Sequence, residues 1–141
     1  MKEKILISAC LLGINCKYNG GNNYNEELIN KLKNKYELIP ICPEIYGGLT
    51  TPRKPSEIIE NRVVNIDNED VTDNYKKGAL ETLKTAKILN VHKAILKSKS
   101  PSCGKGQIYN GEFNNTLIEG NGITTKLLLE NNIEVISDKE I

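Results

Sequence analysis

The chain has 141 residues, enough to bury a sizeable core, so we expect one domain spanning residues 1–141. Its 19 Lys and Arg residues nearly balance its 18 Asp and Glu residues, which argues against a strong overall field that draws the protein to nucleic acid or anionic lipid. Neither a signal-peptide pattern nor a long apolar span is present, so we expect no membrane association and predict a cytoplasmic location. Stable disulfides are rare in the cytoplasm, and the four cysteines are therefore interpreted as free thiols, metal ligands or catalytic groups.

Three of the cysteines follow short apolar segments that predict β-strands. Near-continuous apolar runs of this kind are typical of parallel strands that are covered on both faces. If the strands are neighbours in one sheet, all three thiols lie at its carboxyl edge, where open α/β sheets bind their ligands. The strands and their cysteines are 4–9 with Cys10, 37–41 with Cys42, and 93–97 with Cys103.

The remaining segments predict an alternation of helices and strands. That alternation favours an α/β fold, a three-layer α/β sandwich with a mostly parallel, Rossmann-like sheet. Within residues 107–113, the Asn110-Gly111 pair predicts a hairpin with a two-residue turn. The predicted helices run from a cap at Asn23 or Asn25 to about Lys35, from a cap at Thr72 to about Asn90, and over 123–131; further short strands are expected at 57–60, 62–66 and 134–136.

Three thiols that meet at one sheet edge suit a cubane iron–sulfur cluster, because thiolates hold the irons of such clusters. Three thiolates on four irons leave one iron open, and an open metal position can bind a substrate atom as a Lewis acid. Zinc is the alternative, since three cysteines and one histidine form a common structural site. His92 is the only histidine, and it lies at the start of the third strand, roughly 15 Å from the carboxyl edge. It is therefore a poor fourth ligand.

Cys16 lies six residues beyond Cys10 in a loop rich in Gly and Asn. It could serve as a fourth ligand, as the second thiol of a redox pair, or as a spectator. We favour the spectator, because a cluster held by four thiolates has no open iron and suits electron transfer instead.

Polar side chains near the cysteines are candidates for proton transfer and anion binding. Glu44 follows Cys42 by two residues and could accept a proton from a nucleophilic water. Ser100 and Ser102 flank Pro101 and could orient or protonate a group at the cluster, although turn chemistry alone also explains them. Residues expected to bind substrate or an anion through backbone N–H groups or charge are Gly122 and Thr124 at a helix start, and Arg53, Lys54 and Lys17 on loops.

The chain resembles the thiouracil and thiouridine desulfidase family, formerly a domain-of-unknown-function family. Several separate motifs in the same order carry the resemblance, which covers nearly the whole chain. The matching segments are Ser8-Ala9-Cys10-Leu11-Leu12-Gly13, Cys42-Pro43-Glu44, Gly47-Gly48, Pro52-Arg53, Asp70-Val71-Thr72, Lys97 through Ser100-Pro101-Ser102-Cys103-Gly104, Ile108-Tyr109 and Gly120-Asn121-Gly122.

The resemblance implies a non-redox desulfidase with a [4Fe-4S] cluster on Cys10, Cys42 and Cys103. In such an enzyme the open iron takes the sulfur of a 4-thiouracil-type thiocarbonyl and water replaces it, a hydrolase-type C–S cleavage that releases hydrosulfide. Glu44 matches the residue that activates the water, and Ser100 best matches a serine that assists proton transfer. Family members often have Arg-Tyr-Asp-Gly where this chain has Lys17-Tyr18-Asn19-Gly20, so Lys17 and Tyr18 are expected to contact the substrate without a bidentate arginine contact.

The expected partner is a small thiolated pyrimidine base, nucleoside or nucleotide. Longer relatives carry an extra domain associated with thiolated transfer RNA; its absence and the near-zero net charge make RNA an unfavoured partner. Two other functional classes remain open from the residues alone: a non-catalytic iron–sulfur or metal-binding protein, and a thiol redox protein in which Cys10 and Cys16 pair.

Overall fold

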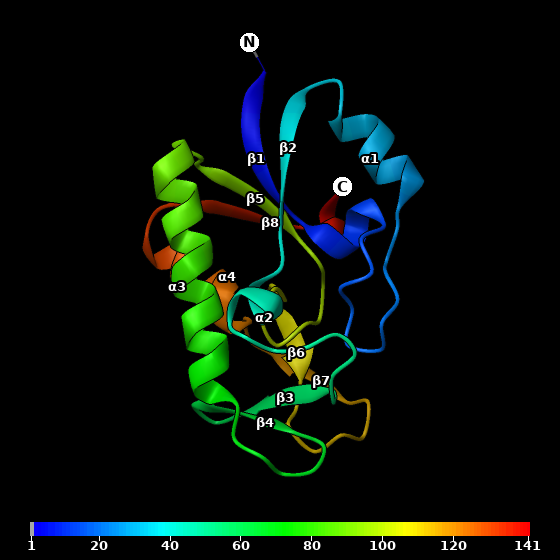
Figure 1. Cartoon of the computed structure of the whole chain (residues 1–141), viewed down its shortest axis with the longest axis vertical. Helices are drawn as coiled ribbons and strands as arrows, with labels where there is room; N and C mark the ends of the chain where they lie inside the picture. The colour runs from blue at the N-terminus through cyan, green and yellow to red at the C-terminus, as the bar shows by residue number, and fades with distance from the viewer. Residues whose placement is uncertain (1) are drawn as a thin grey trace.

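A parallel sheet forms the centre of the molecule, in a computed structural model that describes residues 2–141 (Figure 1). Its four strands pair in the order β2-β1-β5-β8, and every neighbouring pair is parallel. The predicted α/β fold with a mostly parallel sheet is therefore confirmed, and the predicted strand boundaries agree to within a residue. The strands are β1 (Glu3–Ser8), β2 (Tyr36–Ile41), β5 (Lys93–Leu96) and β8 (Glu134–Ser137).

Helices cover both faces of this sheet, because successive strand residues point to opposite sides. Ile5 and Ile7 of β1 pack with Leu28 and Leu32 of α1 (Glu26–Leu32), whereas Leu6 belongs to the core on the other face. That second core contains residues of α3 (Thr72–Leu89) and α4 (Ile123–Glu130). Figure 1 shows α1 and α3 on opposite sides of the strands. The arrangement is a three-layer sandwich.

Two small antiparallel sheets lie beyond the carboxyl edge of the central sheet (Figure 1). One pairs β3 (Ser56–Ile59) with β4 (Arg62–Asn65), as the short apolar segments predict. The other pairs β6 (Gln107–Tyr109) with β7 (Leu117–Glu119). The predicted two-residue turn at Asn110-Gly111 was wrong, since the connection spans residues 110–116. Its cause is described below.

Short helical turns follow the strands at the carboxyl edge and were not predicted. They are too short to show helical periodicity in the sequence. The N-cap of α3 is Val71 and not Thr72, because the Thr72 hydroxyl accepts from the Val63 N–H at 2.9 Å. The short elements are η1 (Ala9–Leu12), α2 (Pro43–Tyr46) and η2 (Asp138–Glu140).

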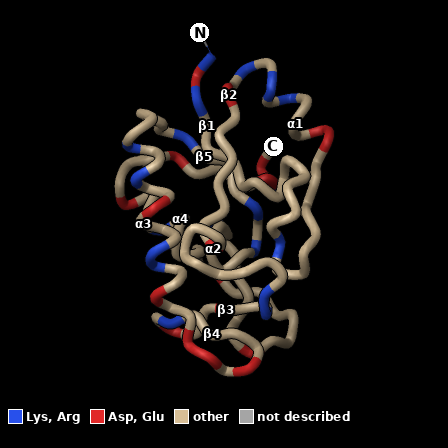
Figure 2. The backbone as a smooth tube through the Cα atoms, in the orientation of Figure 1, with Lys and Arg blue, Asp and Glu red and all other residues tan. Residues whose placement is uncertain are grey.

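Charge is distributed unevenly over this fold. Figure 2 shows acidic residues gathered on the turn after β4 and basic residues on segments near α2. Within residues 2–141, no helix combines the length and apolar character needed to span a bilayer.

Candidate active site

A cavity of about 560 Å³ opens at the carboxyl edge of the central sheet. Its size falls within the range of small-molecule sites. All four cysteines line it: Cys10, Cys16, Cys42 and Cys103. The three predicted ligands therefore share one cavity, although they come from distant parts of the sequence.

Cys10 and Cys42 are the more accessible thiols of the set. Cys10 lies in η1 directly after β1, and Cys42 precedes α2 directly after β2. Hydrogen bonding by the neighbouring Cys16 thiol is the main effect that lowers the pKa of each to about 7, against the opposing effect of burial. Lys97 adds a favourable charge at Cys10. Both thiols are therefore readily available as thiolates, the form that binds metal.

Cys103 is more deeply buried, with 5% of its surface exposed. Burial raises the pKa of its thiol to about 12. Its sulfur borders the aliphatic core but also accepts from the Ser8 hydroxyl at 3.5 Å, and the Ser102 hydroxyl lies 3.6 Å away. A thiol in this environment stays neutral until a metal displaces its proton. The Ser8 hydroxyl then remains to stabilise the sulfur.

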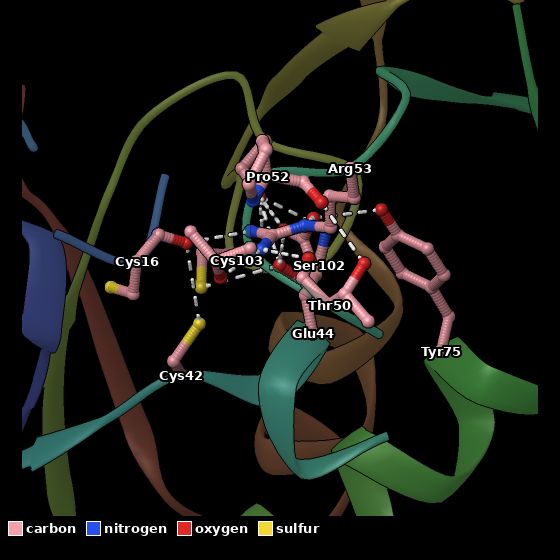
Figure 3. Close-up of polar contacts among 11 residues, drawn as sticks. Cys16, Cys42, Glu44, Thr50, Pro52, Arg53, Tyr75, Ser102 and Cys103 are labelled. Carbon is pink, nitrogen blue, oxygen red and sulfur yellow. Dashed lines mark hydrogen bonds and ion pairs between the residues drawn. The ribbon is translucent and has the colours of Figure 1, made fainter. Parts of the chain in front are cut away.

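Cys16 lies closer to the other thiols than the spectator interpretation implies. It is buried, and its carbonyl oxygen is 4.0 Å from the Cys42 sulfur (Figure 3). Its hydrogen bonds to Cys10 and Cys42, together with burial, raise its own pKa well above the ordinary value. The loop rich in Gly and Asn folds back over the cavity, and no local pattern in the sequence indicates this.

Glu44 lies at the centre of a hydrogen-bonded group beside the thiols. Its Oε1 accepts from the Tyr75 hydroxyl at 2.9 Å and from Arg53 Nε at 3.1 Å (Figure 3). Its Oε2 accepts from Ser102 Oγ at 2.8 Å, and Ser100 Oγ is 3.5 Å away. Charge-assisted hydrogen bonds of this kind fix the orientation of a carboxylate.

The two serines connect the cysteine loop to Glu44. Ser100 Oγ accepts from the N–H groups of Ser102 and Cys103, each at 3.1 Å, so it does stabilise the turn. It also lies 2.9 Å from Ser102 Oγ. The Ser102 hydroxyl donates its one proton to Glu44, so the Ser102 oxygen can accept a hydrogen bond from the Ser100 hydroxyl. A chain of hydrogen bonds therefore runs from Ser100 through Ser102 to Glu44.

Arg53 lines the cavity and organises the hydrogen bonds of the site. Its side chain is 8% exposed, and it donates to Glu44, to Thr50 O and Thr51 Oγ1, and to Cys16 O at 2.8 Å. Four of its five N–H donors are thus used within the protein. Arg53 thereby connects the Cys16 loop to Glu44, and its predicted anion-binding role stays a prediction.

The start of α4 makes backbone hydrogen bonds to the cysteine loop. The N–H of Gly122 donates to Gly104 O, and that of Thr124 donates to Ser102 O. A Cβ at Gly122 would lie 2.5 Å from the Ser102 carbonyl carbon and oxygen, so the helix start packs directly beneath the cysteine loop. The N–H groups of Gly122 and Thr124 already have partners, so both residues support the loop. Their predicted contact with an anion stays a prediction.

Two glycines bring α2 against α3 and so position Glu44. A Cβ at Gly78 would overlap the Pro43 carbonyl oxygen, and one at Gly47 would overlap Asn74 O. Asn74 Nδ2 also donates to Gly47 O at 2.9 Å. The two backbones can approach this closely only without side chains, and the approach places Glu44 within reach of Tyr75 on α3.

Further residues complete the cavity wall. Lys17, Tyr18 and Ser102 line it, and their predicted contacts with substrate stay predictions. Sequence reasoning missed the contributions of Lys97, Lys99, Phe113 and Asn115, which also line the cavity. Lys97 and Lys99 could have been found from their position after the third strand, whereas nothing local marks the other two. Lys54 instead pairs with Asp67 and Glu69.

The donor set suits a cluster better than a single ion. Within residues 2–141, no three His, Cys, Asp or Glu side chains converge closely enough to hold one metal ion. His92 contacts Asn90 and lies before β5, at the opposite edge of the sheet from the thiols. A cubane cluster needs its thiolates spread around its faces, and soft thiolate donors favour iron–sulfur chemistry. The cysteines surrounding the cavity fit that requirement.

Comparison with known proteins identifies the family of this chain. Residues 5–140 match the model of the 2-thiouracil desulfurase family. The uncharacterized protein YbbK of Bacillus subtilis strain 168 is 44% identical, over 97% of each chain. A solved structure described as a [4Fe-4S]-dependent thiouracil desulfidase, TudS, superposes with a TM-score of 0.90 at 38% identity, covering 99% of this chain and 93% of the other. The chain therefore belongs to the 2-thiouracil desulfurase family.

Proposed function

We propose that this protein is a [4Fe-4S]-dependent desulfidase that converts the thiocarbonyl of a 4-thiouracil-type base, nucleoside or nucleotide to a carbonyl and releases hydrosulfide. The observation that carries the proposal is the position of the Glu44 carboxylate in the same cavity as the cysteines. The solved relative is described as [4Fe-4S]-dependent, which supports the same cofactor here.

Cys10, Cys42 and Cys103 would hold the cluster. When bound on three thiolates, it supplies an open iron that acts as a Lewis acid toward the substrate sulfur. Two of the thiols, Cys10 and Cys42, have pKa values lowered to about 7, which favours the thiolate form. Ser8 donates to the third sulfur and would stabilise its negative charge.

Glu44 would act as the general base that accepts a proton from the attacking water. Tyr75 and Arg53 hold one oxygen, and Ser102 donates to the other. The chain of hydroxyls from Ser100 through Ser102 gives that proton a path along the cysteine loop. Positioned proton transfer of this kind contributes about 10²–10⁴-fold to a rate.

The direct test is turnover by protein reconstituted with iron and sulfide without oxygen. The substrates are 4-thiouracil, 4-thiouridine and its 5′-monophosphate, with 2-thiouracil as a positional comparison. Loss of the thiocarbonyl absorbance should accompany equimolar hydrosulfide release. If cluster-loaded protein consumes none of these compounds, the proposed function is wrong.

Matched variants separate cluster binding from catalysis. Glu44→Gln keeps the size of the side chain, so it should retain the cluster absorbance while turnover falls by about 10²–10⁴-fold. Ser100→Ala should slow turnover less. Cys10→Ala, Cys42→Ala and Cys103→Ala should each lose the cluster, whereas Cys16→Ala should keep it. A non-catalytic iron–sulfur protein would instead be indifferent to Glu44→Gln.

A second candidate, a thiol redox function, follows from the position of Cys16. The Cys16 thiol lowers the pKa of its neighbours Cys10 and Cys42, so a disulfide could form between Cys16 and one of them once the cluster is lost. Mass mapping of thiols after anaerobic and aerobic purification distinguishes the two functions. Free thiols throughout exclude the redox candidate, and a stoichiometric disulfide that cycles with a thiol reductant supports it.

A further inference from the structure

The connection between β6 and β7 departs from the turn that its sequence predicts. The β6–β7 ladder ends at the pair Tyr109 and Leu117, and the N–H of Asn110 donates to Thr116 O at 3.0 Å. Residues 111–115 then form a wider connection in place of a two-residue turn. Places where local turn chemistry is overruled are often functional or strained. We call residues 110–116 the β6–β7 loop.

A buried carboxylate holds this loop away from the hairpin. Glu57 of β3 is 9% exposed, and its Oε1 accepts from the N–H of Gly111 at 3.0 Å and of Phe113 at 3.2 Å. Within residues 2–141, no Lys, Arg or His side chain forms an ion pair with it. The hydrogen bonds from these two backbone N–H groups therefore offset the free-energy cost of removing the Glu57 carboxylate from water. Glu57 fixes the loop on β3.

The loop backbone is strained where Glu57 holds it. Gly111, Phe113 and Asn115 have φ values of 90°, 55° and 60°. Gly111 suits this region, and Asn tolerates it, but a bulky aromatic residue rarely adopts it. A Cβ at Gly111 would lie 2.8 Å from Ile58 O, so the loop packs tightly on β3. The surrounding structure therefore imposes the conformation of Phe113, as is common at ligand sites.

Phe113 and Asn115 line the same cavity as the cysteines. Phe113 is the only phenylalanine of the chain, and its side chain is half-buried. Planar heteroaromatic rings stack on aromatic side chains regardless of their substituents. An aromatic wall therefore suits the ring of a thiolated pyrimidine, and the sulfur is left to face the proposed cluster.

We propose that the β6–β7 loop is a preformed wall of the substrate pocket, in which Phe113 stacks on the pyrimidine ring and Glu57 positions Phe113. The proposal rests on the proposed function for the identity of the ring. Phe113 is the residue that contacts the substrate. Glu57 also lines the cavity, and its role in this proposal is to hold the loop. A stacking wall held in advance avoids the ordering that binding would otherwise require.

Substitutions at Phe113 test the contact with the ring. In the reconstituted protein, Phe113→Leu should raise the KM for 4-thiouracil and the Kd for the product uracil, measured by calorimetry, each about tenfold. Its kcat should stay within about twofold, because Glu44 and the thiols are untouched. Phe113→Tyr keeps the aromatic face and should restore both constants. Equal uracil affinity in the wild type and Phe113→Leu would overturn the stacking role.

Substitutions at Glu57 test the positioning role with a readout other than activity. Glu57→Ala should speed hydrogen exchange of the peptide covering residues 110–116 at least tenfold and raise the uracil Kd as Phe113→Leu does. Glu57→Gln keeps an acceptor oxygen and should behave like the wild type. Unchanged exchange in Glu57→Ala, in protein that remains folded by circular dichroism, would overturn this role.

The two proposals fail in different ways. If uracil binding depends on Phe113 but no thiolated pyrimidine is consumed, the pocket recognises pyrimidines and the proposed reaction is wrong. If turnover is intact and both KM and uracil affinity ignore Phe113, the desulfidase proposal stands and the inference about the β6–β7 loop is wrong.

Discussion

Glu44 illustrates how one side chain depends on several distant ones. Both of its carboxylate oxygens have donors: Tyr75 and Arg53 on one, Ser102 on the other. A general base must be held in a fixed orientation, and each of these donors restricts rotation of the Glu44 carboxylate. The residues around Glu44 are therefore expected to affect turnover as well as stability.

Tyr75→Phe isolates one of these donors. Tyr75 is 1% exposed, and burial, followed by the charge of Glu44, raises its pKa well above the ordinary value, so it stays a donor throughout the working pH range. Its replacement should lower kcat about tenfold and the free energy of unfolding by about 1 kcal/mol. Steady-state kinetics and urea unfolding measure the two effects. Tyr24→Phe, at an exposed position, is the control and should change neither.

Arg53→Lys tests whether Arg53 organises the site. Lysine keeps the charge but cannot reproduce four hydrogen bonds to three segments, so buried acceptors at Glu44 and Cys16 lose their donor. The free energy of unfolding should fall by about 1–3 kcal/mol, measured with urea. Lys54→Met removes two exposed ion pairs and should cost less than about 1 kcal/mol. Equal losses in the two variants would contradict the organising role.

At the scale of elements, the sequence predicts whatever depends on local pattern. The strands of the central sheet are continuous apolar runs, and α3 has a long amphipathic stripe, so both were found. The predicted two-residue turn between β6 and β7 was wrong because Glu57, more than fifty residues away, accepts from the loop N–H groups. For the same reason Phe113 could not be assigned to the cavity. Strand ends, by contrast, were enough to place Cys10, Cys42 and Glu44 at one edge.

The contact of α2 with α3 is another element that no local pattern shows. Gly78 lies in the middle of α3, where alanine would ordinarily favour the helix by about 1 kcal/mol. Here a Cβ would overlap the Pro43 carbonyl oxygen, so α2 must move and carry Glu44 with it. The overlap outweighs the gain in helix propensity.

Gly78→Ala should therefore destabilise the protein by about 1–3 kcal/mol and reduce turnover, although the substitution improves helix propensity. Thermal and urea unfolding give the sign, and kinetics with 4-thiouracil give the effect on Glu44. Leu80→Ala, on the exposed face of the same helix, is the control and should alter stability by less than about 0.5 kcal/mol. A stabilised Gly78→Ala protein would show that the two backbones are not in close contact.

For the whole molecule, the proposed cluster connects segments that the fold brings together from three strand ends. Cys10 follows β1, Cys42 follows β2, and Cys103 lies on the loop after β5. A group that binds only the folded chain stabilises it by mass action, by about 2.7 kcal/mol at a hundredfold excess over its Kd. The unfolded chain does not hold the three thiols together, so the cluster should bind the folded state much more tightly than the unfolded state.

Cluster-loaded protein should consequently melt roughly 5–10 °C above the same protein after its iron is removed by a chelator, both measured by calorimetry without oxygen. Cys103→Ala should abolish this difference because it removes one of three ligands, and Cys16→Ala should preserve it because that thiol only neighbours the ligands. If Cys16→Ala abolishes the difference and Cys103→Ala does not, the ligand set is Cys10, Cys16 and Cys42. The buried thiol of Cys103 would then belong to the core, and the open iron would face a different wall of the cavity.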